Sequence, residues 1–207
     1  GRSAKKLNPQ YRALIPMITA VVPMVENAVV VAHASLAPLR SNVMASCYIG
    51  LGANLNAPDA QITLALQALH KLPKTRLIAV SSLYGSKPLG PQDQPDYLNA
   101  VAHIDTELTP LELLDALQQQ ERDQGREKLR HWGERCIDLD VLLYDDLQLH
   151  SERLNIPHLE LAKRNFVVVP LAELAPELRL PSGQLITEIT PEFNGELQKL
   201  HCPVIDL

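Results

Sequence analysis

The pattern of apolar and polar positions predicts alternating strands and helices from Met44 onward. Residues 47–51, 76–83 and 98–104 are short apolar stretches bounded by polar or turn-forming residues, which is typical of β-strands. Between the first two stretches, residues 60–72 carry apolar side chains at the spacing of one helical face. This part of the chain therefore predicts a strand, a helix and two further strands.

A second helix is predicted to begin at Thr109 and Pro110. A threonine hydroxyl caps the first amides of a helix, and proline fits its first turn. Leu113, Leu114 and Leu117 continue along one face, and another apolar strand follows. The resulting βαββαβ order is the split βαβ, ferredoxin-like arrangement, so we expect an α+β fold with a mostly antiparallel sheet.

The remaining segments are expected to flank this core. Asp145 and Asp146 predict a turn into an additional hairpin, and C-terminal elements are expected to complete a domain of residues 44–207. Residues 1–43 are expected to be a poorly ordered N-terminal extension of uncertain origin. Prolines and polar residues interrupt its apolar stretch, so no membrane-spanning helix is expected. A linker, a remnant of another domain, an extended start of the fold and a cleavable leader all remain open.

Two carboxylates lie one residue apart inside the apolar run of residues 136–143, at Asp138 and Asp140. Side chains alternate along a strand, so both should emerge on the same face. At about 5 Å and an effective dielectric near 20 they repel by about 3 kcal/mol, so they need a cation or a shared proton. Mg²⁺ is expected, because it joins protein carboxylates to substrate phosphates. The competing interpretation is an edge strand with solvated aspartates.

The segment of residues 122–135, just before this strand, is rich in cationic side chains and contains the chain's one tryptophan, Trp132. Guanidinium groups match phosphate oxygens, and an indole offers a flat face to a ring. Charged stretches are commonly solvated, so Lys128 and Arg130 taken singly carry little weight. Together with the carboxylates, however, the segment is suited to neutralising a triphosphate.

A long proline-rich connection, residues 86–99, is the type of loop that closes over a site. At its end Tyr97 and Asn99 share a strand face, where they could offer an aromatic surface and an amide to a heterocycle. Alternatively, Tyr97 is a core ring and Asn99 a turn former. Gly50 and Gly52 favour a tight turn, because the further residues of a dinucleotide or phosphate loop are missing.

Composition narrows the class of ligand and the setting. The 207 residues suit one domain with an appendage, and the net charge of −5 disfavours general nucleic-acid binding. A small phosphorylated ligand held by locally concentrated base is favoured instead. The three cysteines are scattered, without a CxxC pair, so a reducing cytoplasm is expected. A membrane partner is not expected either.

Several separated motifs resemble those of the 6-hydroxymethyl-7,8-dihydropterin pyrophosphokinase family of folate biosynthesis. In order along the chain, they are residues 48–55, 88–99, 135–140, 157–158, 164–166 and 170–171. The resemblance spans Met44 to about Glu188. It implies that ATP gives its pyrophosphoryl group to the pterin hydroxymethyl oxygen, leaving AMP and a pterin diphosphate. A monomer with two Mg²⁺ ions is expected.

The resemblance also implies the site residues. Asp138 and Asp140 are expected to hold both Mg²⁺ ions, and Asp140 is expected to orient or deprotonate the attacking hydroxyl. Catalytic charge stabilisation falls on Arg126, Arg135 and Arg164. The expected nucleotide contacts are Glu121, Arg126, Trp132, Arg135, Val141, Arg153, His158 and Arg164. The expected pterin contacts are Ser86, Leu89, Tyr97, Asn99, Trp132 and Phe166, with Tyr97 and Phe166 facing the two sides of the ring.

Some questions stay open beside the resemblance. The chain departs from the family pattern at His131, Glu134, Asn155 and Leu159, which leaves single phosphate contacts and lid closure undecided. Paired aspartates on a ferredoxin-like sheet also suit a palm-like nucleotidyl transferase or cyclase, which would release pyrophosphate. A nucleotide-binding module without catalysis, using the proline-rich loop as a partner surface, is a third interpretation.

Overall fold

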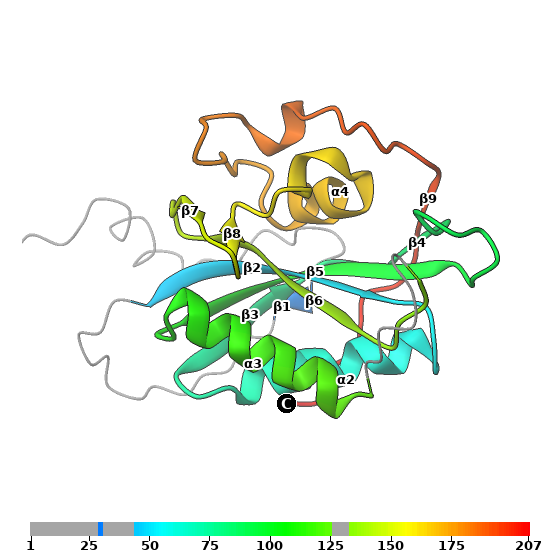
Figure 1. Ribbon diagram of the computed structural model, residues 1–207, viewed down its shortest axis with the longest axis horizontal. Coiled ribbons are helices and arrows are strands. Elements are labelled where there is room, and N and C mark those ends of the chain that lie inside the picture. The colour runs from blue at the N-terminus through cyan, green and yellow to red at the C-terminus, as the bar shows by residue number, and fades with distance from the viewer. Residues whose placement is uncertain (1–28, 31–43, 126–132) are drawn as a thin grey trace, which may run out of the picture.

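A central antiparallel sheet carries helices on both of its faces, as Figure 1 shows. In this computed structural model the described residues are 29–30, 44–125 and 133–207. Helices α2 (Pro58–Lys71) and α3 (Pro110–Asp123) cover one face. Helix α4 (Asn165–Leu174) covers the other face.

The main sheet has the strand order β1-β3-β5-β2-β6, and every pair in that order is antiparallel. The strands in this order are β1 (Val29–Val30), β2 (Ala45–Ala53), β3 (Thr75–Val80), β5 (Tyr97–Thr106) and β6 (Asp138–Tyr144), and two further strands join the sheet beside β5. Helix α2 connects β2 to β3 with β5 between them, and α3 connects β5 to β6 with β2 between them. The predicted ferredoxin-like βαββαβ core is therefore confirmed.

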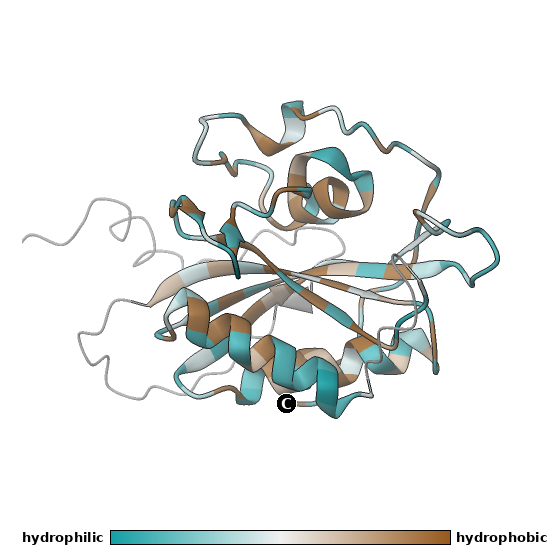
Figure 2. Cartoon of the chain, in the orientation of Figure 1, coloured by the Kyte–Doolittle hydropathy of each residue, from teal (hydrophilic) through white to brown (hydrophobic). Residues whose placement is uncertain are grey.

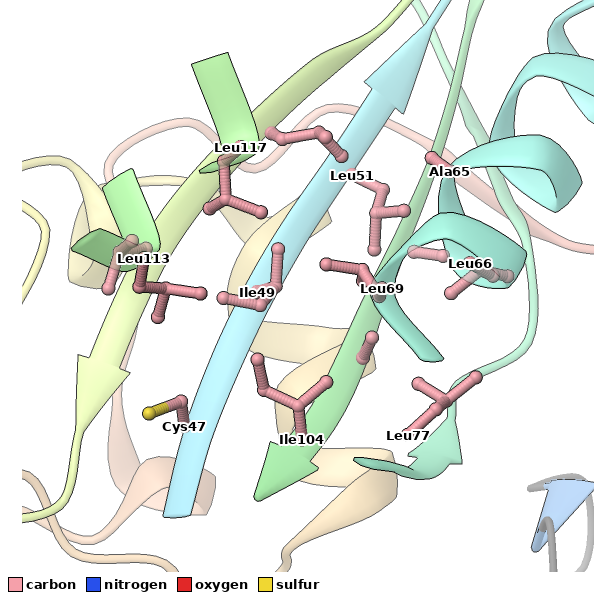
Figure 3. Packing of buried hydrophobic residues seen from close by; sticks show 14 of the residues in the cluster. Cys47, Ile49, Leu51, Ala65, Leu66, Leu69, Leu77, Ile104, Leu113 and Leu117 are labelled. Carbon is pink, nitrogen blue, oxygen red and sulfur yellow. The ribbon is translucent and has the colours of Figure 1, made fainter. Parts of the chain in front are cut away.

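Apolar side chains fill the layer between the sheet and helices α2 and α3. Figure 3 shows Ile49 and Leu51 of β2 among Leu66 and Leu69 of α2 and Leu117 of α3. Each of the five is nearly or completely buried. Burying one such side chain contributes about 1.5–3 kcal/mol, so this layer stabilises the strands of the sheet. The candidate site lies on the opposite face of the same strands.

A second apolar cluster joins α4 to the opposite face, and Figure 2 shows α4 as mostly hydrophobic. Val168 and Leu171 of α4 pack here with Val101 of β5 and with Leu142 and Leu143 of β6. A β-bulge in the pairing of β6 with β2 allows these two consecutive leucines to enter the same cluster. Regular alternation would have placed them on opposite faces.

Helix α3 begins as the sequence predicts. The Thr109 hydroxyl accepts a hydrogen bond from the Glu112 amide at 3.3 Å, and the Glu112 carboxylate accepts one from the Thr109 amide at 3.1 Å. Pro110 occupies the first turn. This reciprocal capping box satisfies amide groups that lack partners within the helix.

The structure differs from the single strand predicted at 76–83. Strand β3 ends before Ser81, and a separate strand β4 (Tyr84–Ser86) pairs with β5 and with β9 (Leu197–Lys199). Ser81 is fully buried, and its hydroxyl accepts a hydrogen bond from the backbone of β5 at 2.9 Å. This side-chain contact replaces the regular ladder at the break.

The turn predicted at Asp145 and Asp146 is present, with Asp145 in the left-handed region at φ 45°. The additional hairpin lies beyond it, because β7 (Leu149–His150) and β8 (Asn155–Ile156) pair with each other in a separate sheet. Two short 3₁₀ helices complete the elements of the described residues, at Leu161–Lys163 and Ile186–Glu188.

Most of the predicted extension, residues 1–43, lies outside the described residues. Its described part is Val29–Val30, which forms β1 and pairs with β3. In the part of the chain that the structure describes, no helix combines the length and hydrophobicity needed to cross a membrane.

Candidate active site

A cavity of about 300 Å³ opens on the α4 face of the sheet. Strands β2, β4, β5 and β6 supply its floor and sides, and the start of α4 closes it. It brings together ten of the predicted site residues, namely Ser86, Leu89, Tyr97, Asn99, Arg135, Asp138, Asp140, His158, Arg164 and Phe166.

Two glycines of β2 leave space at the floor of this cavity, because they carry no side chains. A Cβ at Gly52 would lie 3.1 Å from the Asn99 side-chain oxygen, and a Cβ at Gly50 would lie 3.3 Å from Leu142. Both glycines are inside β2, so the tight turn predicted for them is wrong. What the sequence signalled was the close approach of neighbouring side chains to the strand.

Asp138 and Asp140 emerge from β6 into the cavity, opposite Gly52 and Gly50 respectively. Their side chains are 23% and 38% exposed. Strand β6 stands at the end of the strand order, as the competing interpretation required. The aspartates nevertheless line the cavity and are only partly exposed, so the edge position of β6 does not leave them fully solvated.

Each of the two carboxylates lies beside a basic side chain. Asp138 accepts a hydrogen bond from the Arg135 guanidinium at 2.6 Å, and Asp140 lies 3.9 Å from the His158 ring nitrogen Nε2. Burial lowers the pKa of Arg135, but Asp138 and Tyr97 more than offset this and raise it, so the guanidinium is charged. Each aspartate thus meets a nitrogen of a basic side chain.

This donor set fits a hard divalent cation bound together with phosphate. No cluster of three or more acidic, histidine or cysteine side chains suited to a metal occurs among residues 44–125 and 133–207. Asp138 and Asp140 supply two carboxylates, and Mg²⁺ commonly takes one or two from the protein and the remaining oxygens from substrate and water. The pair would accordingly bind Mg²⁺ weakly without a phosphorylated ligand.

The opposite end of the cavity combines aromatic and amide groups. Asn99 donates to the Ser86 hydroxyl at 2.9 Å, and both side chains are buried. Tyr97 donates to the Gly133 carbonyl at 2.8 Å, and burial raises the pKa of this phenol, which stays neutral. Since both Tyr97 and Asn99 lie in β5 and line the cavity, neither is the core ring or turn former of the alternative interpretation.

Arg164 and His158 provide further basic groups beside Phe166. The Arg164 guanidinium lies 5.8 Å from the Phe166 ring centre. Its Nε atom is buried and has no hydrogen-bond acceptor among the described residues, with Glu160 4.0 Å away. Burial, followed by the charge of Arg164, lowers the pKa of His158, so the imidazole is neutral near pH 7. A buried donor without an acceptor suits an anionic ligand.

Three predicted nucleotide contacts do not line this cavity. Glu121 is buried on α3, where it accepts a hydrogen bond from the Leu139 amide at 2.8 Å. The Val141 side chain lies in the cluster on the α2 and α3 side. Arg153 is half exposed and pairs with Asp115 of α3. Arg126 and Trp132 lie outside the described residues.

Asn54 is a residue of the site region that sequence reasoning did not single out. Its fully hydrogen-bonded amide donates to Gln94 at 3.0 Å and to the Pro95 carbonyl at 2.9 Å, and it accepts from the Arg135 amide at 3.0 Å. It therefore connects the proline-rich loop to the segment before β6. Asn54 lies within residues 48–55, the first motif shared with the family, so the sequence did contain a signal that could have identified it. Lys87, also missed, lines the cavity and pairs with Asp96 at 3.0 Å.

Comparisons with known proteins agree with this geometry. A family model described as 7,8-dihydro-6-hydroxymethylpterin-pyrophosphokinase matches residues 48–176. The 2-amino-4-hydroxy-6-hydroxymethyldihydropteridine pyrophosphokinase of Haemophilus influenzae is 56% identical over 150 residues, covering 72% of this chain and 94% of the relative. The protein of the same name from Pseudomonas aeruginosa is 53% identical over 142 residues, covering 69% and 88%.

A solved structure shares the fold at low sequence identity. The crystal structure of Plasmodium falciparum HPPK-DHPS wild type superposes with a TM-score of 0.57 and 14% identity. The match covers 72% of this chain and 44% of that longer chain. At this identity the likeness supports the fold alone.

Proposed function

Since the chain belongs to the 7,8-dihydro-6-hydroxymethylpterin-pyrophosphokinase family, we propose that the cavity on the α4 face is where its reaction takes place. That reaction transfers the pyrophosphoryl group of ATP to 6-hydroxymethyl-7,8-dihydropterin in folate biosynthesis, giving AMP and the pterin diphosphate. A palm-like transferase and a module without catalysis are excluded by family membership. The observation that carries the site assignment is the pair of aspartates facing an amide and aromatic pocket in one cavity.

Asp138 and Asp140 are the proposed ligands of two Mg²⁺ ions that enter with ATP. When bound, Mg²⁺ supplies positive charge that neutralises the triphosphate. The protein's own contribution is to hold both carboxylates on one strand face, before the reaction begins. Asp140 has the His158 ring beside it and is the proposed group that orients the pterin hydroxyl.

Arg135 and Arg164 are the proposed stabilisers of charge on the transferred group, together with Arg126. Transfer of a phosphoryl group needs alignment and charge neutralisation more than a strong base. Arg164 supports this role through its buried Nε donor, which has no acceptor among the described residues. The other nucleotide contacts, Glu121, Trp132, Val141, Arg153 and His158, keep their predicted roles as proposals. Because the Val141 side chain faces away from the cavity, its contact would be made by backbone atoms.

The pterin is proposed to lie between Tyr97 and Phe166, with Trp132 as a further proposed contact. Flat rings are favoured in such a slot, since an aromatic face on each side buries large apolar area. Asn99 and Ser86 lie at its edge, where an amide can donate to and accept from a heterocycle. Leu89 completes the pocket.

The oligomeric state and the cellular compartment are also proposals. We expect residues 44–207 to act as a monomer in the cytoplasm, without a nucleic-acid or membrane partner. The three cysteines are free, which is compatible with a reducing compartment.

The metal assignment is tested by replacing each aspartate with the isosteric amide. Asp138→Asn and Asp140→Asn are expected to lower turnover by about a hundredfold or more, because they remove metal-binding charge without changing shape. Asp105→Asn is the matched control, since Asp105 lies on the same sheet but pairs with Arg76 away from the cavity. Turnover would be measured across a Mg²⁺ titration. Near-normal turnover of either variant would contradict the assignment.

A further inference from the structure

Glu173, near the C-terminal end of α4, ties that helix to the sheet. Its carboxylate accepts hydrogen bonds from the Ser82 amide at 3.1 Å, the Ser82 hydroxyl at 2.8 Å and the Tyr84 hydroxyl at 2.5 Å. Ser82 is fully buried and Tyr84 is 5% exposed. Burial, followed by the bond to Glu173, raises the pKa of Tyr84, so the phenol remains a donor. Hydrogen bonds to a charged acceptor are stronger than neutral ones.

The two elements joined by Glu173 both line the proposed pterin slot, since α4 supplies Phe166 at one face of the ring and β4 supplies Ser86 at its edge. Phe166 precedes Glu173 by seven residues, about two helical turns, so both lie on the same side of α4. Tyr84 and Ser86 are two residues apart in β4 and therefore share a strand face. In the pairing of β4 with β5, Tyr84 stands opposite Asn99. One contact thus links the helix that carries Phe166 to the strand that carries Ser86.

The hydrogen-bond ladder of helix α4 is incomplete near its middle. Pro170 lies inside the helix and has no amide hydrogen to donate to the Phe166 carbonyl. At the start of the helix, the Asn165 side chain donates to the Gly195 carbonyl at 2.6 Å. At the other end, Glu173 bonds to Tyr84 of β4 and to Ser82 just before that strand. The axis of the helix is therefore fixed from both ends.

We propose that Glu173 is a positioning residue for the pterin substrate, which sets the separation between Phe166 and the Ser86–Asn99 pair by joining α4 to β4. The proposal rests on the placement of the pterin in this slot under the proposed function. Glu173 does not line the cavity, so it acts through the residues that do. A weaker link would loosen the fit of a flat ring between its walls and would leave the ATP side unchanged.

Glu173→Gln and Tyr84→Phe test the link while nearly preserving side-chain volume. Both variants are expected to raise the KM for the pterin about three- to tenfold and to leave the KM for ATP within about twofold. Tyr144→Phe is the matched control. Tyr144 lies in β6 of the same sheet, and its phenol donates to the Leu108 carbonyl at 2.6 Å, outside the cavity. It should lower the melting temperature without raising the pterin KM.

The double variant Glu173→Gln, Tyr84→Phe should raise the pterin KM less than the two single effects combined, because both variants weaken the contact between Glu173 and Tyr84. The proposal is wrong if the single variants lower the melting temperature like the control and leave the pterin KM unchanged. It is also wrong if the KM values for pterin and ATP rise together, which would indicate a general loss of structure.

Asn99→Ala tests the placement of the pterin in the slot separately from the positioning role of Glu173. As a proposed direct contact, Asn99 should affect the pterin KM whether or not Glu173 matters. An effect of Asn99→Ala with none from the Glu173 and Tyr84 variants overturns the positioning role alone. If Asn99→Ala leaves the pterin KM unchanged, the pterin slot is wrongly placed, and the positioning role falls with it.

Discussion

Gly52 shows how a single missing side chain keeps the cavity open. The Asn99 amide lies directly over this glycine and donates to Ser86. A methyl group at Gly52 would come within 3.1 Å of the Asn99 oxygen, closer than nearly all real contacts of this kind. The amide would have to move, and its hydrogen bond to Ser86 would be disturbed.

Gly52→Ala is therefore expected to raise the KM for the pterin by about tenfold, and to cost about 1–3 kcal/mol of stability through overpacking. Steady-state kinetics and thermal unfolding would measure the two effects. Gly85→Ala is the matched control, because a Cβ there meets its nearest atom at an ordinary 3.8 Å in β4. Equal pterin KM values for both variants would show that Asn99 does not need its present position.

Sequence reasoning succeeded at residues whose direction follows from the strand itself. Asp138 and Asp140 share a face because side chains alternate, and the register with Gly52 and Gly50 confirms it. The interaction partner of Arg153 could not be predicted in this way. Its contact with Asp115 depends on where a hairpin and a helix meet in the folded chain.

At the scale of elements, Asn54 couples two loops that border the site. Through four hydrogen bonds it joins Gln94 and Pro95 of the proline-rich loop to the backbone of Arg135. Asn54 is only 2% exposed. Loss of its amide would leave buried groups without partners, which costs about 1–3 kcal/mol for each.

Asn54→Ala is expected to lower turnover and to speed amide hydrogen exchange both in the loop near Gln94 and at Arg135. Gln92→Ala is the matched control, because Gln92 bonds only to carbonyls of its own loop among the contacts described for its side chain. Hydrogen exchange followed by mass spectrometry would resolve the two segments. If exchange at Arg135 were unchanged, the two loops would be independent.

Element boundaries were predictable where local chemistry sets them. The capping box of Thr109 and Glu112 starts α3 where the sequence indicates. The break between β3 and β4 was not predictable, because buried Ser81 and Ser82 find their partners on β5 and α4. The bulge at Leu142 likewise follows from the pairing of β6 with β2.

At the scale of the whole molecule, the surroundings of His103 predict a stability that depends on pH. Its ring stacks on Tyr48 at 4.7 Å, and its Nε2 lies 2.7 Å from the Ser46 hydroxyl and 3.8 Å from Asp105. Burial lowers the pKa of His103, although Asp105 acts in the opposite direction. Arg76 pairs with the same aspartate.

A histidine with a depressed folded pKa favours the folded state above the unfolded pKa of about 6.5 and loses this contribution as the pH falls below it. The melting temperature should therefore fall between about pH 7 and pH 5, and His103→Gln should show a shallower fall over the same interval. Calorimetry at several pH values would measure both slopes. Identical slopes would mean that His103 does not titrate in this way.

The cavity as a whole lay beyond what local patterns could predict. Its walls come from four strands and the start of α4, which meet only after the split βαβ topology forms. Resemblance to the family named most of the lining residues, since separated motifs carry information about tertiary neighbours. It could not reveal Glu173, which acts at a distance from the substrate.

The identity of the nucleotide product tests the central claim most directly. Purified protein would be mixed with ATP, Mg²⁺ and 6-hydroxymethyl-7,8-dihydropterin, and the nucleotides and pterins separated over time. We predict AMP and the pterin diphosphate in equal amounts, with formation of both abolished when the metal is chelated. Formation of ADP, release of free pyrophosphate in step with AMP from the start, or no consumption of the pterin would contradict the account.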